Sequence, residues 1–183
     1  FSMSKAKPDC RAVAAKCLTA VSNGSSLSQQ IPLFEHTLAE SDRPLFRQLC
    51  YGVLRFFPKL IGIEKQLLSK PLKSKDRDIQ MLLLLGLYQL SEMRTPDHAA
   101  VNTTVNATKA LKKGWAKGLV NGVLRKWQRD RETLVAALSD AEQQSHPQWL
   151  HDALLKAWPN HATAIEQANN LQAPMCLRVN TQH

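Results

Sequence analysis

Apolar residues recur at spacings of three and four along almost the whole chain, which is the period of one buried face of an α-helix. In the stretch from Ile79 to Leu90, so few polar positions remain that a central helix, surrounded by the others, is expected. Glycine accounts for 7 of the 183 residues, and no run of β-branched residues occurs before position 175. The fold class predicted from this pattern is all-α.

Turn and cap residues divide the pattern into a bundle of about seven or eight helices. Asn23 and Gly24 end the first helix, because both tolerate a positive φ. Side-chain caps are expected at Ser41 or Asp42 and at Ser74. The expected helices cover about 9–21, 27–39, 42–57, 59–68, 74–90, 97–111, 115–129 and 130–139.

The seventh of these helices carries large apolar residues at a strict spacing of four, and this stripe is interpreted as core. It consists of Trp115, Leu119, Val123 and Trp127. Aromatic residues can also stack on unpaired bases, although each is more often part of a core. The candidates for stacking are Tyr51, Phe56, Phe57, Tyr88 and Trp115.

The pattern changes near residue 140, where a domain boundary is predicted. Segment 140–145 is interpreted as a connection, helices are expected at about 146–158 and 159–170, and residues 175–181 alternate like a strand. A lone strand lacks partners, so 141–183 is predicted to be the start of a truncated linker domain. Met3 follows Phe1 and Ser2 as if those two residues had been added for expression, so positions 1–3 are set apart from the bundle of residues 4–140.

The chain is strongly basic, with 24 Lys and Arg against 15 Asp and Glu and a formal charge of +9. This surplus favours a polyanionic partner, and nucleic acid is expected rather than a membrane, because no basic helix has a broad apolar face. The longest apolar run, residues 81–88, is too short for a transmembrane helix. Four cysteines without a CxxC pair predict a reduced, cytoplasmic protein, and six scattered histidines predict no metal site.

The densest positive charge lies between residues 109 and 131, where Asp130 is the only acid. This cluster comprises Lys109, Lys112, Lys113, Lys117, Arg125, Lys126, Arg129 and Arg131. Such a cluster neutralises phosphates, and a merely solvated helix face is the alternative. A weaker basic group comprises Lys5, Lys7, Arg11 and Lys16. Asn121 either caps a buried backbone group or hydrogen-bonds a base.

No pattern typical of a catalytic site is found. The chain has no glycine-rich phosphate loop, nucleophile elbow or helix-borne carboxylate pair, and Cys176 has no base beside it. His98 is expected to supply a helix cap or a buried hydrogen bond rather than to act as a general base. No catalytic residue is therefore predicted.

Four segments, in order, resemble the signature segments of NusB-type RNA-binding domains: LFRQLCYGVLR at 45–55, GLYQL at 86–90, PDHAAVN at 96–102 and GLVNGVLR at 118–125. The continuation, with HPQWL at 146–150, APM at 173–175 and LRVN at 177–180, is similar to the junction in the bacterial RsmB/Sun/Fmu family of 16S ribosomal RNA cytosine-C5 methyltransferases. The resemblance implies an N-terminal RNA-binding module, followed in that family by a methyltransferase domain that binds S-adenosylmethionine. That domain's motifs are not found here, so the cofactor is implied for the longer protein and not for this fragment.

The resemblance also implies RNA contacts, because in NusB the basic N-terminal helix and the surface beside the Val-Asn-Gly segment contribute to them. These features point to Lys7, Arg11, Asn121 and Arg125, although Pro8 and Asp9 stand where NusB is rich in arginine. Together with the basic cluster, the predicted RNA-binding residues are Lys7, Arg11, Lys109, Lys112, Lys113, Lys117, Asn121, Arg125, Lys126 and Arg129.

The function predicted from the sequence is to position 16S ribosomal RNA for methylation by a downstream domain. The expected partners are RNA and that methyltransferase domain. One alternative is a protein-binding helical adaptor, which would show a large exposed apolar patch. Another is a NusB-type transcription antitermination factor.

Overall fold

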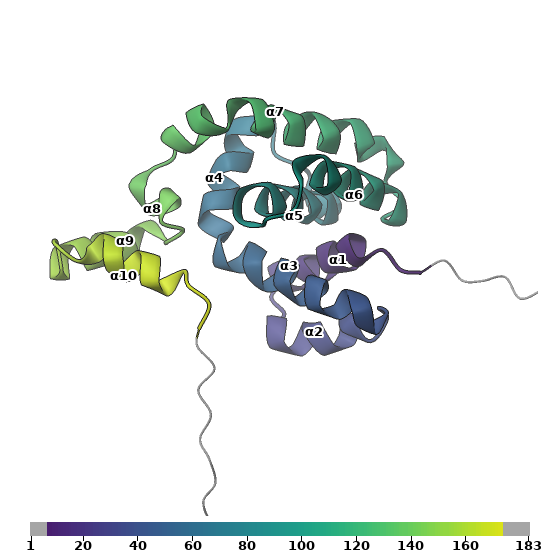
Figure 1. Cartoon of the computed structure of the whole chain (residues 1–183), viewed down its shortest axis with the longest axis horizontal. Coiled ribbons are helices and arrows are strands. Elements are labelled where there is room, and N and C mark those ends of the chain that lie inside the picture. Colours follow the sequence, from purple (N-terminus) through teal and green to yellow (C-terminus); the bar gives the residue numbers. More distant parts are fainter. Residues whose placement is uncertain (1–6, 174–183) are drawn as a thin grey trace, which may run out of the picture.

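A computed structural model describes residues 7–173 and confirms that this part of the chain is all-α. Ten α-helices and no strand are found within it (Figure 1). The helices are α1 Cys10–Ser22, α2 Leu27–Glu35, α3 Arg43–Arg55, α4 Phe57–Leu67, α5 Arg77–Glu92, α6 Asp97–Ala110, α7 Lys117–Ala136, α8 Asp140–Gln143, α9 Gln148–Ala157 and α10 Ala162–Asn169. The strand predicted at 175–181 lies outside the described residues.

The central helix of the bundle is α5, as the sequence predicted. Helices α1, α3, α4, α6 and α7 all pack against it (Figure 1). Every residue from 81 to 90 is buried. A Cβ added at Gly86 would lie 2.8 Å from both Leu124 methyl carbons, which shows how closely α5 and α7 cross. The missing side chain at Gly86 therefore allows the two helices to pack.

Several predicted helix ends differ from the observed ones. The boundary predicted at position 130 is present as a kink inside α7, where the backbone of Asp130 is non-helical (φ −111°, ψ 18°), and the part after the kink ends at Ala136 instead of Ser139. Ser41, Asp42 and Ser74 lie in 3-10 turns that precede α3 and α5, and neither helix has the predicted side-chain cap. In both cases the chain enters the helix through a tighter helical turn instead of an extended cap residue.

The interpretation of Trp115 as core is wrong, because its side chain is 59% exposed. Val123 and Trp127 are buried, and Leu119 is half-buried. An α-helix advances about 100° per residue, so a spacing of four drifts by about 40° at each step and leaves the buried face within three steps. Trp115 also lies in a 3-10 turn, Gly114–Ala116, which does not continue the α-helical register.

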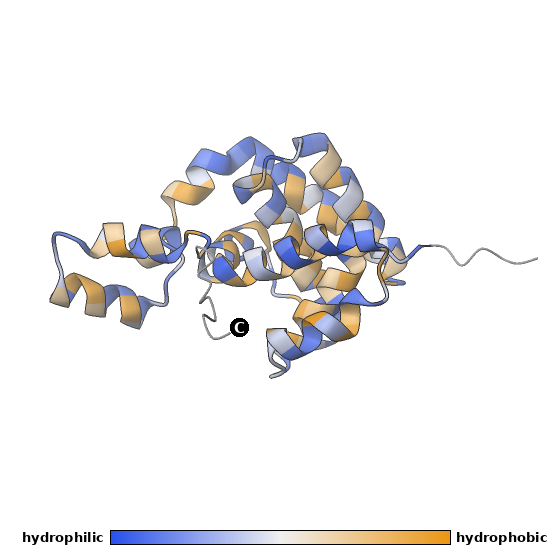
Figure 2. Cartoon of the chain, turned by 60° about the horizontal axis from the view of Figure 1, so that its bottom comes forward, coloured by the Kyte–Doolittle hydropathy of each residue, from blue (hydrophilic) through white to orange (hydrophobic). Residues whose placement is uncertain are grey.

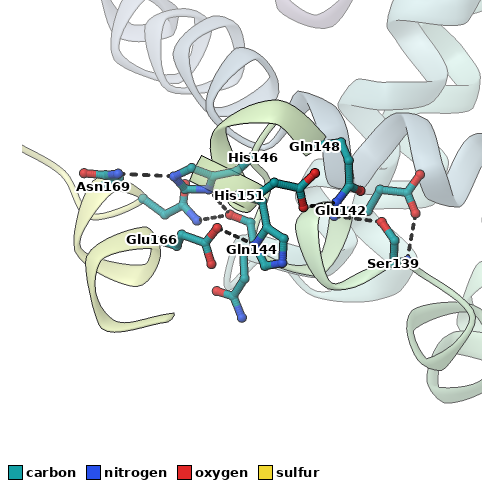
Figure 3. Close-up of polar contacts among 10 residues, drawn as sticks. Ser139, Glu142, Gln144, His146, Gln148, His151, Glu166 and Asn169 are labelled. Carbon is teal, nitrogen blue, oxygen red and sulfur yellow. Dashed lines mark hydrogen bonds and ion pairs between the residues drawn. The ribbon is translucent and has the colours of Figure 1, made fainter. Parts of the chain in front are cut away.

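The segment expected to be a connection after residue 139 contains a capped helical turn, α8. The Ser139 side chain accepts a hydrogen bond from the Glu142 backbone, and the Glu142 carboxylate accepts one from the Ser139 backbone, at 3.2 and 2.9 Å. This reciprocal capping box stabilises the single turn (Figure 3). Helix α8 packs against α4 on one side and α9 on the other, so the segment links the bundle to α9 and α10.

A buried hydrogen bond joins α9 to α10. His151 Nδ1 lies 2.6 Å from Glu166 Oε1, and both side chains are nearly inaccessible (Figure 3). Asn169 and the backbone oxygen of Gln144 contact the two ring nitrogens of His146, at 3.2 and 2.6 Å. These contacts hold α9 and α10 together and connect them to the end of α8.

Candidate nucleic-acid interface

Most of the predicted RNA-binding residues are exposed. Lys109, Lys112, Lys117, Arg125, Lys126 and Arg129 form no ion pair with any carboxylate of residues 7–173. All six belong to α6, to the turn after it or to α7. Positive charge that no internal acid neutralises is therefore concentrated along these two antiparallel helices.

A groove of about 460 Å³ runs between α6 and α7. Asn102 and Asn106 line it from α6, and Lys117, Gly118 and Asn121 line it from α7. Amide side chains offer both donors and acceptors, so this groove can bind phosphate oxygens as well as base edges. Val105 contributes an apolar part of the lining, and the three asparagines and Lys117 supply the polar groups that a nucleic-acid strand requires.

The structure excludes one of the two roles predicted for Asn121, and the hydrogen bond to a base stays a prediction. Its Oδ1 accepts a hydrogen bond from Arg125 Nε at 3.1 Å, and no backbone group of the described residues bonds to its side chain. Asn121 therefore does not cap a buried backbone group. Asn121 lines the groove and Arg125 bonds to it, and both side chains retain further donors.

Part of the outer surface of α7 next to this groove has no side chains, because glycines occupy it. Gly118 and Gly122 lie one turn apart and are exposed, and a Cβ added to either would meet no atom within 4 Å. Gly114, one turn earlier, is equally open. A phosphate backbone can thus approach the helix closely between the flanking cations.

Lys113 has partners that the sequence does not reveal. Its Nζ lies 2.7 Å from Asp78 Oδ1 and 3.1 Å from Asp76 Oδ1, and it donates to the backbone oxygen of Lys75 at 2.8 Å. Desolvation opposes the charged form, but these acceptors outweigh it and raise the pKa of Lys113. Lys113 ties the α6–α7 turn to the start of α5, and its contact with RNA stays a prediction.

Arg11 is likewise engaged inside the fold. Its Nε donates to Gln89 Oε1 at 2.9 Å, and Gln89 in turn donates to Thr104 Oγ1 at 3.0 Å. Burial lowers the pKa of Arg11 from its ordinary value. Asp9 caps α1, because its side chain accepts hydrogen bonds from two backbone amides. Lys7 is exposed just before this cap.

Sequence reasoning missed three lysines that the fold brings to the same region. Lys70, Lys73 and Lys75 are exposed on the loop between α4 and α5, and the loop lines a cleft with Trp115. Three lysines within six residues could have indicated a basic site. Their distance in sequence from the basic cluster at 109–131 gave no sign that the fold brings the two close together. Two of the five aromatic candidates are exposed, Trp115 at 59% and Tyr51 at 48%.

The remaining candidates for chemistry offer no reactive arrangement. His98 is exposed and hydrogen-bonds to no described residue, so the expectation of a cap or a buried bond is wrong. The α6 N-cap position is taken by Pro96, which leaves His98 inside the first turn with its ring in solvent. Cys10, Cys17 and Cys50 are buried free thiols. Residues 7–173 contain no group of metal-ligating side chains and no helix long and apolar enough to cross a membrane.

Two protein-family models match the chain. Residues 8–129 match the NusB family, and residues 146–183 match the Methyltr_RsmF/B-like, ferredoxin-like domain. The first match contains every predicted RNA-binding residue except Lys7. The resemblance predicted from the sequence motifs is therefore confirmed.

Curated relatives named Ribosomal RNA small subunit methyltransferase B are similar to nearly the whole chain. The relative from Pasteurella multocida is 48% identical over 173 residues, that from Vibrio cholerae 46% over 176 and that from Erwinia tasmaniensis 42% over 181. These alignments cover 94%, 94% and 98% of this chain but 39%, 41% and 42% of the relatives. The chain thus spans about two fifths of the length of these relatives.

Proposed function

The chain belongs to the NusB family, and on that premise we propose that it is an RNA-binding module that positions small-subunit ribosomal RNA for modification. The modification would be cytosine-C5 methylation, carried out in the cytoplasm by a downstream domain of the longer protein. The names of its relatives support this assignment, since they denote methyltransferases of small-subunit ribosomal RNA.

The observation that carries the proposal is the unneutralised positive face of α6 and α7. Six cations without a carboxylate partner among the described residues lie on α6, on the turn after it and on α7, the two helices whose groove is lined by three asparagines and Lys117. Glycines leave part of the α7 surface open. Contacts of this kind grip the phosphate backbone and fix its position without reading the sequence. Positioning alone contributes to catalysis by holding the reacting groups together.

In this proposal the chain supplies no catalytic group. S-adenosylmethionine would be bound by the downstream domain, and none of the described residues is assigned to it. The part played by this chain is to hold the RNA so that the target cytosine reaches that domain.

The test is fluorescence anisotropy with a stem-loop from small-subunit ribosomal RNA and with a duplex control, at several salt concentrations. If about four phosphates are neutralised, log K should fall against log salt with a slope of roughly −3. A triple variant, Lys109→Gln, Lys117→Gln and Arg129→Gln, should lose affinity and show a shallower slope.

The matched control carries the same number of charge removals outside the α6–α7 face. Lys65, Arg94 and Lys156 are exposed on other parts of the chain and form no ion pair among the described residues. Their replacement by Gln should leave the slope nearly unchanged. Equal losses in the two triple variants would show that the attraction is diffuse and would contradict a defined interface.

A protein-contact function is favoured by a different observation. Trp149 and Leu171 are 71% and 70% exposed, and Trp158 and Leu155 are 54% and 42% exposed. These residues lie on or next to α9 and α10, which extend from the side of the bundle (Figure 2). We propose that these exposed apolar side chains contact another folded domain, which is compatible with RNA binding on α6 and α7.

A further inference from the structure

The surroundings of Trp115 form a cleft that the basic face alone does not explain. The cleft has a volume of about 550 Å³ and lies between the α4–α5 loop and the beginning of α7. The apolar part of its wall is formed by Trp115, Leu119 and Leu72. Its positive charge comes from Lys70, Lys73 and Lys75. An exposed indole is thus bordered by three flexible cations.

The two sides of this cleft are fastened to each other. Lys113 Nζ binds the Lys75 backbone oxygen at 2.8 Å and the carboxylates of Asp76 and Asp78. The backbone of Ala116, next to Trp115, donates to the Lys113 oxygen at 3.0 Å. The lysine-bearing loop and the turn that carries Trp115 are therefore held at a fixed separation before any ligand binds.

The charge of the cleft is positive despite the acid in its lining. Asp76 is 8% exposed and already paired with Lys113. Lys70, Lys73 and Lys75 form no ion pair with described residues. An anionic ligand with a flat apolar part is complementary to this combination.

We propose that Trp115 is a stacking platform for an unpaired RNA base, with Lys70, Lys73 and Lys75 binding the flanking phosphates. The proposal rests on the RNA-binding function proposed above and deepens it, because it specifies a single-stranded segment. A base within a duplex is already stacked between its neighbours and cannot lie on the indole without being extruded. An aromatic platform beside cations is the arrangement by which proteins bind single strands.

The experiment compares binding of a short unstructured oligoribonucleotide and of an RNA duplex to the full chain. Trp115→Ala should weaken binding of the single strand roughly tenfold, the usual effect of removing one stacking aromatic, and leave duplex binding unchanged. Trp115→Phe should lose less, because it keeps a ring. Trp149→Ala is the matched control, since it removes another exposed indole and should have no effect.

A second measurement separates stacking from charge. Trp115→Ala should leave the salt slope as it is, whereas replacing Lys70, Lys73 and Lys75 by Gln should make it shallower, by about 0.7 for each phosphate contact that is lost. Because all four side chains are exposed, the variants should keep the wild-type circular dichroism and melting temperature.

The outcomes distinguish this inference from the proposed function. Salt-sensitive RNA binding that Trp115→Ala does not weaken would overturn the stacking platform and leave the RNA-binding function standing. An equal loss for single strand and duplex would also overturn it. Absence of RNA binding by the wild-type chain at low salt would overturn both.

Discussion

Replacement of Gly122 tests the proposed interface through two quantities, the stability of the fold and the affinity for RNA. The residue lies inside α7, is exposed, and a Cβ there would meet no atom within 4 Å. Alanine or leucine at an open helical position stabilises a helix by about 0.5–1 kcal/mol relative to glycine, because the unfolded chain loses less freedom on folding. For a chain of this size that corresponds to a rise of about 1–4 °C in melting temperature.

The two replacements should differ in their effect on RNA. Gly122→Ala adds one methyl group, whereas Gly122→Leu projects a branched side chain from the surface where we place the phosphate backbone. We expect both variants to melt at a higher temperature and the leucine variant to bind RNA about tenfold more weakly, a loss of about 1.4 kcal/mol. Thermal unfolding followed by circular dichroism, and anisotropy with the same RNA, measure the two effects.

Gly52 supplies the contrast. A Cβ at Gly52 would lie 2.0 Å from Tyr88 Cζ, so Gly52→Ala should destabilise the fold, by about 1–3 kcal/mol or more. A leucine variant at Gly122 that melts lower than the wild type would show that the surface is not open. A leucine variant that is more stable but binds RNA with wild-type affinity would refute the close approach of RNA to α7.

Three further predictions concern single residues. Lys113→Gln should lower stability by about 1–2 kcal/mol, because Asp76 and Asp78 lose their cation. Since the folded pKa of Lys113 lies above its ordinary 10.5, this stabilisation is complete below pH 10.5 and is lost as the pH rises through the folded pKa, which denaturant titrations across that range would show. Lys112 has a φ of 57°, so Lys112→Gly should raise the free energy of unfolding by about 1 kcal/mol. The same change should make the salt slope of RNA binding shallower by about 0.7. An unchanged melting temperature would contradict backbone strain at Lys112. Burial raises the pKa of Glu64, so the wild type loses stability as the pH rises above 4.5. The melting temperature of Glu64→Gln should therefore gain on that of the wild type between pH 4.5 and neutral pH. A difference in melting temperature between the two proteins that is the same at all pH values would refute this.

The helical framework could be predicted because it depends on local pattern. The continuous burial of α5 follows from its composition, and the change of direction at Asp130 coincides with a boundary read from the sequence. What could not be predicted depends on side chains that meet from distant positions. The carboxylate of Asp78 binds Lys113 from 35 residues away, and the amide of Gln89 binds Arg11 from 78 residues away. A count of charges along the chain does not reveal which cations are already neutralised.

The wrong expectation for Trp115 falls within the candidate interface, and the reason is physical. Within residues 112–122, Lys112 adopts a left-handed backbone, Trp115 exposes an indole, and Lys117 opens a helix whose first turn has no acid. Gly118 and Gly122 occupy open helical positions where almost any other residue would favour the helix more. Each of these residues lowers local stability. Lys117 places a positive charge at the positive end of the helix dipole, Lys112 has a strained backbone, Trp115 exposes apolar surface, and the glycines raise the entropy of the unfolded chain. A concentration of local conflicts of this kind is expected where a surface is shaped for a ligand. Stability alone does not account for this segment, whereas a strand of RNA lying across it would use every one of these features.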